Sequence, residues 1–172
     1  MTRAVAFDEG TLSAALELSL TSGTGPSAGL RAEDGWTLVA ANGTVTADRL
    51  AVRAAALPVP LHGVTGQVVC AGTTVRAARL AFATPRAAWE AAGSVEGVRA
   101  PVLHLVLASP AADLAEWRPD AAGRGPCRIA LDGPAADPVV AVDADLRDVR
   151  AGELAVRRVR GRGTASDHGR LV

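Results

Sequence analysis

The residues from Gly25 to Gly29 read Gly-Pro-Ser-Ala-Gly and match the G-x-S-x-G spacing of a hydrolase nucleophile elbow. In that motif the serine sits on a sharp turn between a strand and a helix, and an acid and a histidine follow in the chain. Here Pro26 distorts the turn before the serine, and Asp34-Gly35 interrupts any helix that follows. The segment is better explained as a flexible loop, and Ser27 is kept as a catalytic candidate only.

The three histidines, His62, His104 and His168, lie far apart, and none has a second metal ligand at helical spacing. His104 lies between Leu103 and Leu105, so the strand period directs it away from the apolar side. His62 lies in a predicted turn, and turns carry functional side chains more often than strands do. An enzyme would need at least two of Ser27, His62 and His104 within hydrogen-bond reach.

The charged residues near the C-terminus form two groups. Asp143 and Asp145 share one face of a predicted strand, with Asp148 nearby, but the Gly and Glu of an EF-hand loop are missing. The four arginines of the other group could bind anionic lipid or phosphate, or could protect an edge strand from aggregation. They are the candidate ligand-binding or partner-binding residues: Arg157, Arg158, Arg160 and Arg162.

The composition excludes several classes of function. The formal charge is zero, which argues against a nucleic-acid partner. All 18 cationic residues are arginine, as GC-rich coding favours, so no lysine can serve a Walker phosphate loop, a Schiff base or a kinase site. Cys70 and Cys127 have no metal-ligand spacing and are expected to be buried, inert thiols. We therefore expect no cofactor and no metal.

An apolar frame recurs four times and indicates how these residues are positioned. It consists of a Val, an Ala two residues later, a Leu after five and a large apolar residue after seven. Steps of two are the period of one strand face, whereas the step of three from Ala to Leu changes the phase and predicts a bulge or bend. The copies are Val45, Ala47, Leu50, Val52; Val75, Ala77, Leu80, Phe82; Val98, Ala100, Leu103, Leu105; and Val149, Ala151, Leu154, Val156.

The pattern of the whole chain predicts an all-β fold, mostly antiparallel, as a sandwich or a long curved sheet with two short helices. Residues 12–20 alternate as a half-buried strand, and hairpins are expected about Asn42-Gly43 and Gly72. The helices are expected from Thr84 to Gly93 and from Ser109 to Trp117. Further expectations are a strand over 98–108, a loop over 118–126 and strands over 127–131, 138–146 and 148–160.

The length of 172 residues predicts a single domain over 1–163, followed by a polar tail over 164–172. The N-terminus has acids where a signal peptide would be apolar, and no stretch reaches the roughly 18 apolar residues of a spanning helix. A complete chain would therefore be cytoplasmic and without a transmembrane segment. If an export signal has been removed, the cell envelope is the alternative.

Residues 139–161 carry the rhythm Val-Val-Ala-Val-Asp-Ala-Asp-Leu, then Asp-Val, Gly-Glu-Leu-Ala-Val and Val-Arg-Gly. This cadence resembles actinobacterial lipid-binding and AsmA-like proteins, which repeat such strands around an apolar groove. The resemblance implies a sheet protein that binds an apolar ligand, and it assigns no functional residue.

The sequence thus favours a protein without enzymatic activity that works through an alanine-, valine- and leucine-lined sheet face. That face would bind an apolar small molecule or a protein partner, or would assemble the chain with itself as a homo-oligomer. The alternative is a small hydrolase or isomerase with Ser27, His62 or His104 in a polar cleft.

Overall fold

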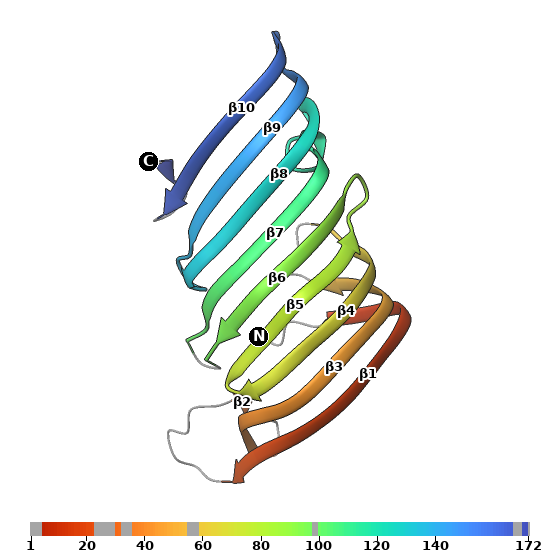
Figure 1. The fold of residues 1–172 in the computed structure, drawn as a ribbon, viewed down its shortest axis with the longest axis vertical. Coiled ribbons are helices and arrows are strands. Elements are labelled where there is room, and N and C mark those ends of the chain that lie inside the picture. Colours follow the sequence, from red (N-terminus) through yellow and green to blue (C-terminus); the bar gives the residue numbers. More distant parts are fainter. Residues whose placement is uncertain are drawn as a thin grey trace.

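The protein forms one open antiparallel sheet that curves along its length (Figure 1). The computed structural model describes residues 5–22, 30–31, 36–54, 59–97, 100–166 and 170–171. Nine long strands follow one another up and down, and each pairs with the next in the chain. Their bounds are β1 Val5–Ser22, β3 Trp36–Ala54, β4 Leu61–Gly72, β5 Thr74–Ala83, β6 Ala88–Glu96, β7 Val102–Asp113, β8 Ala121–Pro134, β9 Val139–Ala151 and β10 Leu154–Ser166.

Three short elements complete the fold. β2 (Leu30–Arg31) pairs with β3, β11 (Arg170–Leu171) pairs with β10, and η1 (Leu114–Glu116) is a single 3₁₀ turn between β7 and β8. The predicted all-β, antiparallel fold is confirmed, as a single curved sheet instead of a sandwich. No helix in the described part of the chain is long and apolar enough to cross a membrane.

Bulges occur at the Ala-to-Leu step in two copies of the apolar frame. The β3–β4 register shifts between Ala47 and Leu50, where Arg49 has a φ of 53°. The β5–β6 register shifts between Ala77 and Leu80. An extra residue in one strand keeps both halves of the frame on the same face and bends the strand.

The other two copies of the frame make the step differently. Ala151 ends β9 and Leu154 begins β10, so Gly152 and Glu153 form a hairpin turn. In the remaining copy Ala100 precedes the start of β7, and Val98 lies outside the described residues. In these two copies the step from Ala to Leu is made at a turn or before a strand begins and not as a bulge within one strand, and internal duplication stays a prediction.

The hairpin predicted at Asn42-Gly43 is wrong, because β3 runs straight through both residues. Gly43 pairs with Leu16 on β1 and with Cys70 on β4, so the strand is flanked on both sides. A Cβ on Gly43 would lie 2.0 Å from the carbonyl oxygen of Ala15, so this glycine serves close strand packing instead of a turn. The hairpin predicted about Gly72 is confirmed, with Gly72 at a φ of 63°.

The two predicted helices are also wrong. Thr84 to Ala87 form a tight turn closed by the Thr84 amide, which donates to the Ala87 carbonyl at 2.8 Å, and Ala88–Glu96 is strand β6. Ser109-Pro110 lies within β7, and only η1 follows it. Alanine favours helices locally, but pairing of β6 with both β5 and β7 satisfies its backbone and overrides that propensity.

The C-terminal strands are longer than the sequence predicts. The predicted loop over 118–126 is wrong because β8 begins at Ala121, and the predicted break near Arg147 is wrong because β9 continues to Ala151. β10 continues to Ser166, beyond the boundary expected at residue 163. Pairing with neighbouring strands extends through these polar, Gly-rich segments.

The cross-strand register gives the sheet two chemically different faces. Residues that pair across neighbouring strands form lines that cross the sheet. On one face, which we call the apolar face, two such lines cross all nine long strands and contain no polar residue. One such line is Leu12, Ala47, Gly66, Leu80, Ala91, Leu107, Ile129, Val142 and Gly163, and the next is Ala14, Val45, Val68, Ala77, Gly93, Leu105, Leu131, Val140 and Ala165. The polar face carries the alternate residues, including Arg76, Ser94, His104 and Asp132.

The main buried cluster lies at one part of the apolar face, and Ala47, Leu50 and Ala51 of β3 form a second buried group. Trp89, Ala112, Ala87 and Cys127 form the main cluster, with Ala112 fully buried and Trp89 only 4% exposed. Trp117, which follows η1, packs edge-on against Trp89 with 5.6 Å between ring centroids. The chain's own β7–β8 connection thus covers this part of the sheet.

Candidate binding faces

The apolar face is partly uncovered where it crosses β1, β4 and β5. Leu12, Leu16 and Val75 have exposed fractions of 50%, 39% and 42%. Leu16 is joined to Val75 by a line of apolar-face residues through Gly43 and Cys70. We call Leu12, Leu16 and Val75 the open stretch, because no other part of the described chain covers them.

The total accessible surface area also indicates that part of the sheet is uncovered. The accessible surface is 11519 Å², whereas a folded monomer of this mass would expose about 7,900 Å². The difference of about 3,600 Å² is larger than the area that each partner buries in a standard protein interface, about 800 Å². The sheet therefore exposes enough surface to accommodate a second layer.

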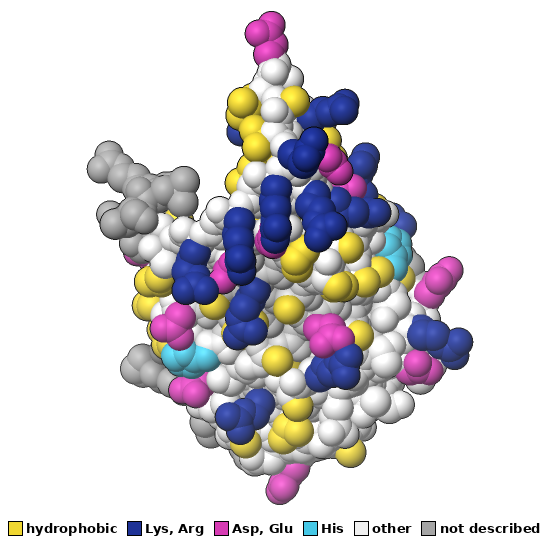
Figure 2. Space-filling model, turned by 45° about the horizontal axis from the view of Figure 1, so that its top comes forward, with side chains coloured by type: hydrophobic (Ala, Val, Ile, Leu, Met, Phe, Trp, Pro, Cys, Tyr) yellow, Lys and Arg dark blue, Asp and Glu magenta, His cyan; other side chains and the backbone are white. Residues whose placement is uncertain are grey.

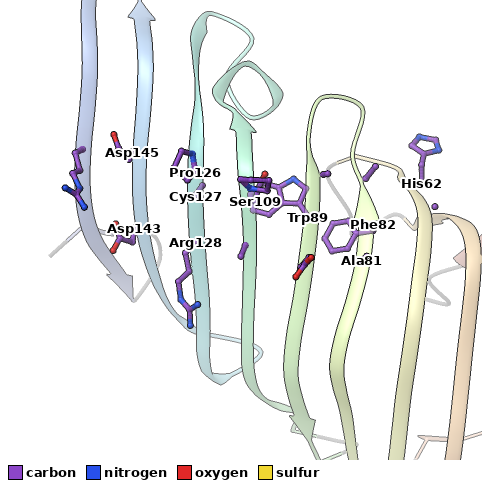
Figure 3. Close-up of a pocket in the computed structure, with 17 residues that line it drawn as sticks. His62, Ala81, Phe82, Trp89, Ser109, Pro126, Cys127, Arg128, Asp143 and Asp145 are labelled. Carbon is purple, nitrogen blue, oxygen red and sulfur yellow. The ribbon is translucent and has the colours of Figure 1, made fainter.

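A groove of about 860 Å³ crosses the polar face from β4 to β10 (Figure 3). Most of its lining comes from polar-face positions, and four residues at apolar-face positions also contribute: Phe82, Trp89, Ser109 and Cys127. The apolar wall residues are alanines and prolines: Ala81, Ala83, Ala88, Ala108, Pro110 and Pro126. The charged and polar residues are His62, Glu90, Arg128, Asp143, Asp145 and Arg160.

The carboxylates of this groove are each engaged by an arginine. Asp145 accepts from Arg158 Nε at 2.6 Å, and Asp143 accepts from Arg162 Nη2 at 2.7 Å. Glu90 accepts from Arg79. The hydrogen bond from Arg158 is the main cause that lowers the pKa of Asp145 below its usual value, so this carboxylate stays ionised.

The four candidate arginines lie on β10, and two of them are held in these ion pairs. Arg158 pairs with Asp145 and Arg162 pairs with Asp143, each across the β9–β10 ladder. Arg160 lines the groove, and Arg157 lies outside it. In Figure 2 the Arg side chains gather toward the top of the view, where the C-terminal strands come forward.

The two catalytic candidates that the structure describes, His62 and His104, do not come together. His62 aligns with Ala83 and Ala88, whereas His104 aligns with Ser94 six residues further along β6. Strand spacing and rise then put the two histidines roughly 25 Å apart, which is too far for proton transfer between them. His104 Nδ1 instead lies against the carboxylate of Asp132 at the surface. Ser27 and His168 lie outside the described residues.

The two cysteines differ in burial. Cys127 is buried, and burial raises the pKa of its thiol, so it is an inert core residue as expected. Cys70, which was also expected to be buried, is only half-buried, on the apolar face. Among the described residues no three His, Cys, Asp or Glu side chains are grouped so that they could hold a metal ion.

The groove was missed in the sequence because its walls come from seven strands, β4 to β10, spread over about a hundred residues. The local signal was alanine at strand positions that face the polar side of the sheet, for example Ala81 and Ala83 on β5.

Comparison of the chain with protein-family models, with curated proteins and with solved structures gives no match.

Proposed function

We propose that the protein is a non-enzymatic assembly module, which packs its apolar face against the same face of a second copy of the chain. The observation that carries the proposal is the pair of apolar lines that cross all nine long strands, with the open stretch still exposed. A sheet that is apolar on one side is stable when that side packs against another element.

The kind of surface favours a protein partner over a small ligand. The described apolar face is broad and built from Val, Leu, Ala and Gly, which suits two sheets packing about 10 Å apart with interdigitating side chains. The excess of about 3,600 Å² on one chain is larger than the about 1,000 to 2,500 Å² that each partner buries in an obligate dimer, so the chain exposes enough surface for such an interface. A two-fold arrangement would let each copy present the identical surface to the other.

The polar face and the C-terminal end of the sheet are less suited to association with a second copy. The polar face carries ion pairs such as Arg79 with Glu90, and β10 carries Arg157, Arg158, Arg160 and Arg162 near the end of the sheet. Charged edge strands resist pairing with another sheet edge. Face-to-face packing through the apolar side is therefore favoured over growth through β10.

The distance between His62 and His104 supports a non-enzymatic role. With these two residues roughly 25 Å apart, the route that joins them in one catalytic site is lost. The three carboxylates of the groove, on Glu90, Asp143 and Asp145, are each engaged by an arginine.

The test compares two valines of equal exposure on opposite faces. Val75 on the apolar face is 42% exposed, and Val69 on the neighbouring strand is 44% exposed on the polar face. Val75→Asp would place an unpaired carboxylate in the proposed interface and should weaken association at least about tenfold. Val69→Asp should leave association unchanged. The measurement is mass by size exclusion with light scattering across a concentration series.

A wild-type protein that stays monomeric throughout the series would overturn the proposal. Equal effects of Val75→Asp and Val69→Asp would also contradict it, because the interface would then not be the apolar face. A monomer that carries a bound lipid in native mass spectrometry would favour the apolar ligand instead of the second copy.

A further inference from the structure

The groove on the polar face has an apolar wall between the charged residues of that face. Ala83 and Ala88 face each other across β5 and β6, and Ala108 continues the wall on β7. Pro110 and Pro126 complete it on β7 and β8. From β5 to β8 this wall spans three strand spacings, about 15 Å. Short alanine side chains leave the space that longer side chains would fill.

The charge of the groove is positive once its ion pairs are counted. Its three carboxylates, on Glu90, Asp143 and Asp145, are engaged by arginines that do not line the groove: Arg79, Arg162 and Arg158. The two arginines that do line it make no ion pair within the described part of the chain: Arg128 and Arg160. Both lie at the β8–β10 end, next to the apolar wall.

We infer that this groove binds a long-chain carboxylate, with the alkyl chain against the Ala and Pro wall and the carboxylate at Arg128 and Arg160. The groove volume of about 860 Å³ lies within the range of small-molecule sites, about 300 to 1,000 Å³. The planar guanidinium donates two parallel hydrogen bonds to a carboxylate, which makes arginine the suited anchor. Arg128 and Arg160 lie across the ladder from Asp143 and Asp145, which other arginines engage, so an added anion would give each guanidinium a direct partner, whereas a cationic headgroup would be repelled by both.

This inference does not depend on the proposed assembly. The groove lies on the polar face, and the proposed interface lies on the opposite face of the same strands. Ligand binding and association can therefore be measured separately, and either one can fail while the other holds.

The experiment is calorimetric titration of the full chain with dodecanoate, dodecyltrimethylammonium and acetate. Dodecanoate should bind; the cation with the same chain and the anion without a chain should bind at least about tenfold more weakly. The double variant Arg128→Gln with Arg160→Gln should weaken dodecanoate binding at least about tenfold, since two charge-assisted hydrogen bonds are lost. Arg76→Gln, on the polar face outside the groove, is the matched control and should bind as the wild type does.

A second pair of variants tests the place of the alkyl chain. Ala108→Phe should fill the groove and weaken dodecanoate binding at least about tenfold, whereas Ala92→Phe, on the same face outside the lining, should not. Thermal melting confirms that each variant is folded. Equal binding of dodecanoate and the cation, or wild-type affinity in either groove variant, would overturn the inference.

Discussion

The core cluster of Trp89, Ala112, Ala87 and Cys127 and the open stretch of Leu12, Leu16 and Val75 lie on the same face but differ in cover. The chain covers the cluster itself, because η1 brings Trp117 onto Trp89. No described segment covers the open stretch, although its residues are apolar like those of the cluster. The difference suggests a division of work, in which the cluster stabilises the monomer and the open stretch serves association.

The largest expected effect comes from removing the centre of the core cluster. Trp89→Ala should lower the free energy of unfolding by about 3 to 5 kcal/mol, because it deletes a buried aromatic side chain and leaves a cavity. Trp117→Ala should cost less, since Trp117 is an exposed residue that contacts the cluster from outside. Chemical denaturation of monomeric samples measures both. If the two variants lost equal free energy of unfolding, Trp117 would belong to the core as much as Trp89 does, which would contradict this description.

A smaller effect is expected from the close approach of strands on the apolar face. A Cβ on Gly93 would lie 1.9 Å from the His104 carbonyl oxygen, at a φ of 134°. Gly93→Ala should therefore destabilise the fold by about 1 to 3 kcal/mol through backbone strain. Gly161→Ala, where nothing lies within 4 Å, is the control and should stay within about 0.5 kcal/mol of the wild type. A neutral Gly93→Ala would contradict this packing.

The smallest expected effect concerns the polar face, where charges are paired within the chain. The pKa of Asp145 is lowered from 3.8, first by its hydrogen bond with Arg158. A lowered pKa in the folded state stabilises the protein above the unfolded pKa, and this contribution is lost as the pH falls through the folded value. The free energy of unfolding, measured from pH 6 down to about 2, should therefore fall less steeply for Asp145→Asn than for the wild type.

The partner variant provides the control for that pH effect. Arg158→Gln should make the free energy of unfolding fall less steeply at low pH, as Asp145→Asn does. The double variant should differ little from either single variant, because each substitution removes the same interaction. The change should be small, since the pair is at the surface and screened by solvent. Additive effects of the two substitutions would show that they act separately.

The sequence predicted the features that depend on local period. The step from Ala47 to Leu50 predicted a bulge, the alternation from Leu12 to Leu20 predicted a strand, and Gly72 predicted a hairpin. Each of these patterns acts within a few residues, so single-strand geometry is enough to interpret it.

The wrong predictions arose where neighbouring strands decide the conformation. Asn42-Gly43 has the residues of a tight turn, but β1 and β4 hold it extended. The Ala-rich segment after Pro85 has helical propensity, but it pairs on both sides as β6. The groove could not be predicted either, because it needs the register that brings Ala83, Ala108 and Arg160 to one face.

Cys70 offers a direct probe of the central claim that a second copy covers the apolar face. It is half-buried in the line that joins Leu16 to Val75, whereas Cys127 is buried in the core and its thiol pKa is raised by burial. A thiol reagent should therefore react with Cys70 and leave Cys127 unmodified in the folded protein. Cys70→Ser serves as the control that assigns the signal.

The decisive measurement is the rate of Cys70 alkylation as a function of protein concentration. If a second copy packs on the apolar face, the rate per molecule should fall as concentration rises, and Val75→Asp should restore the fast rate. A rate that stays constant from dilute monomer to the highest soluble concentration would contradict the account, because the apolar face would then remain uncovered.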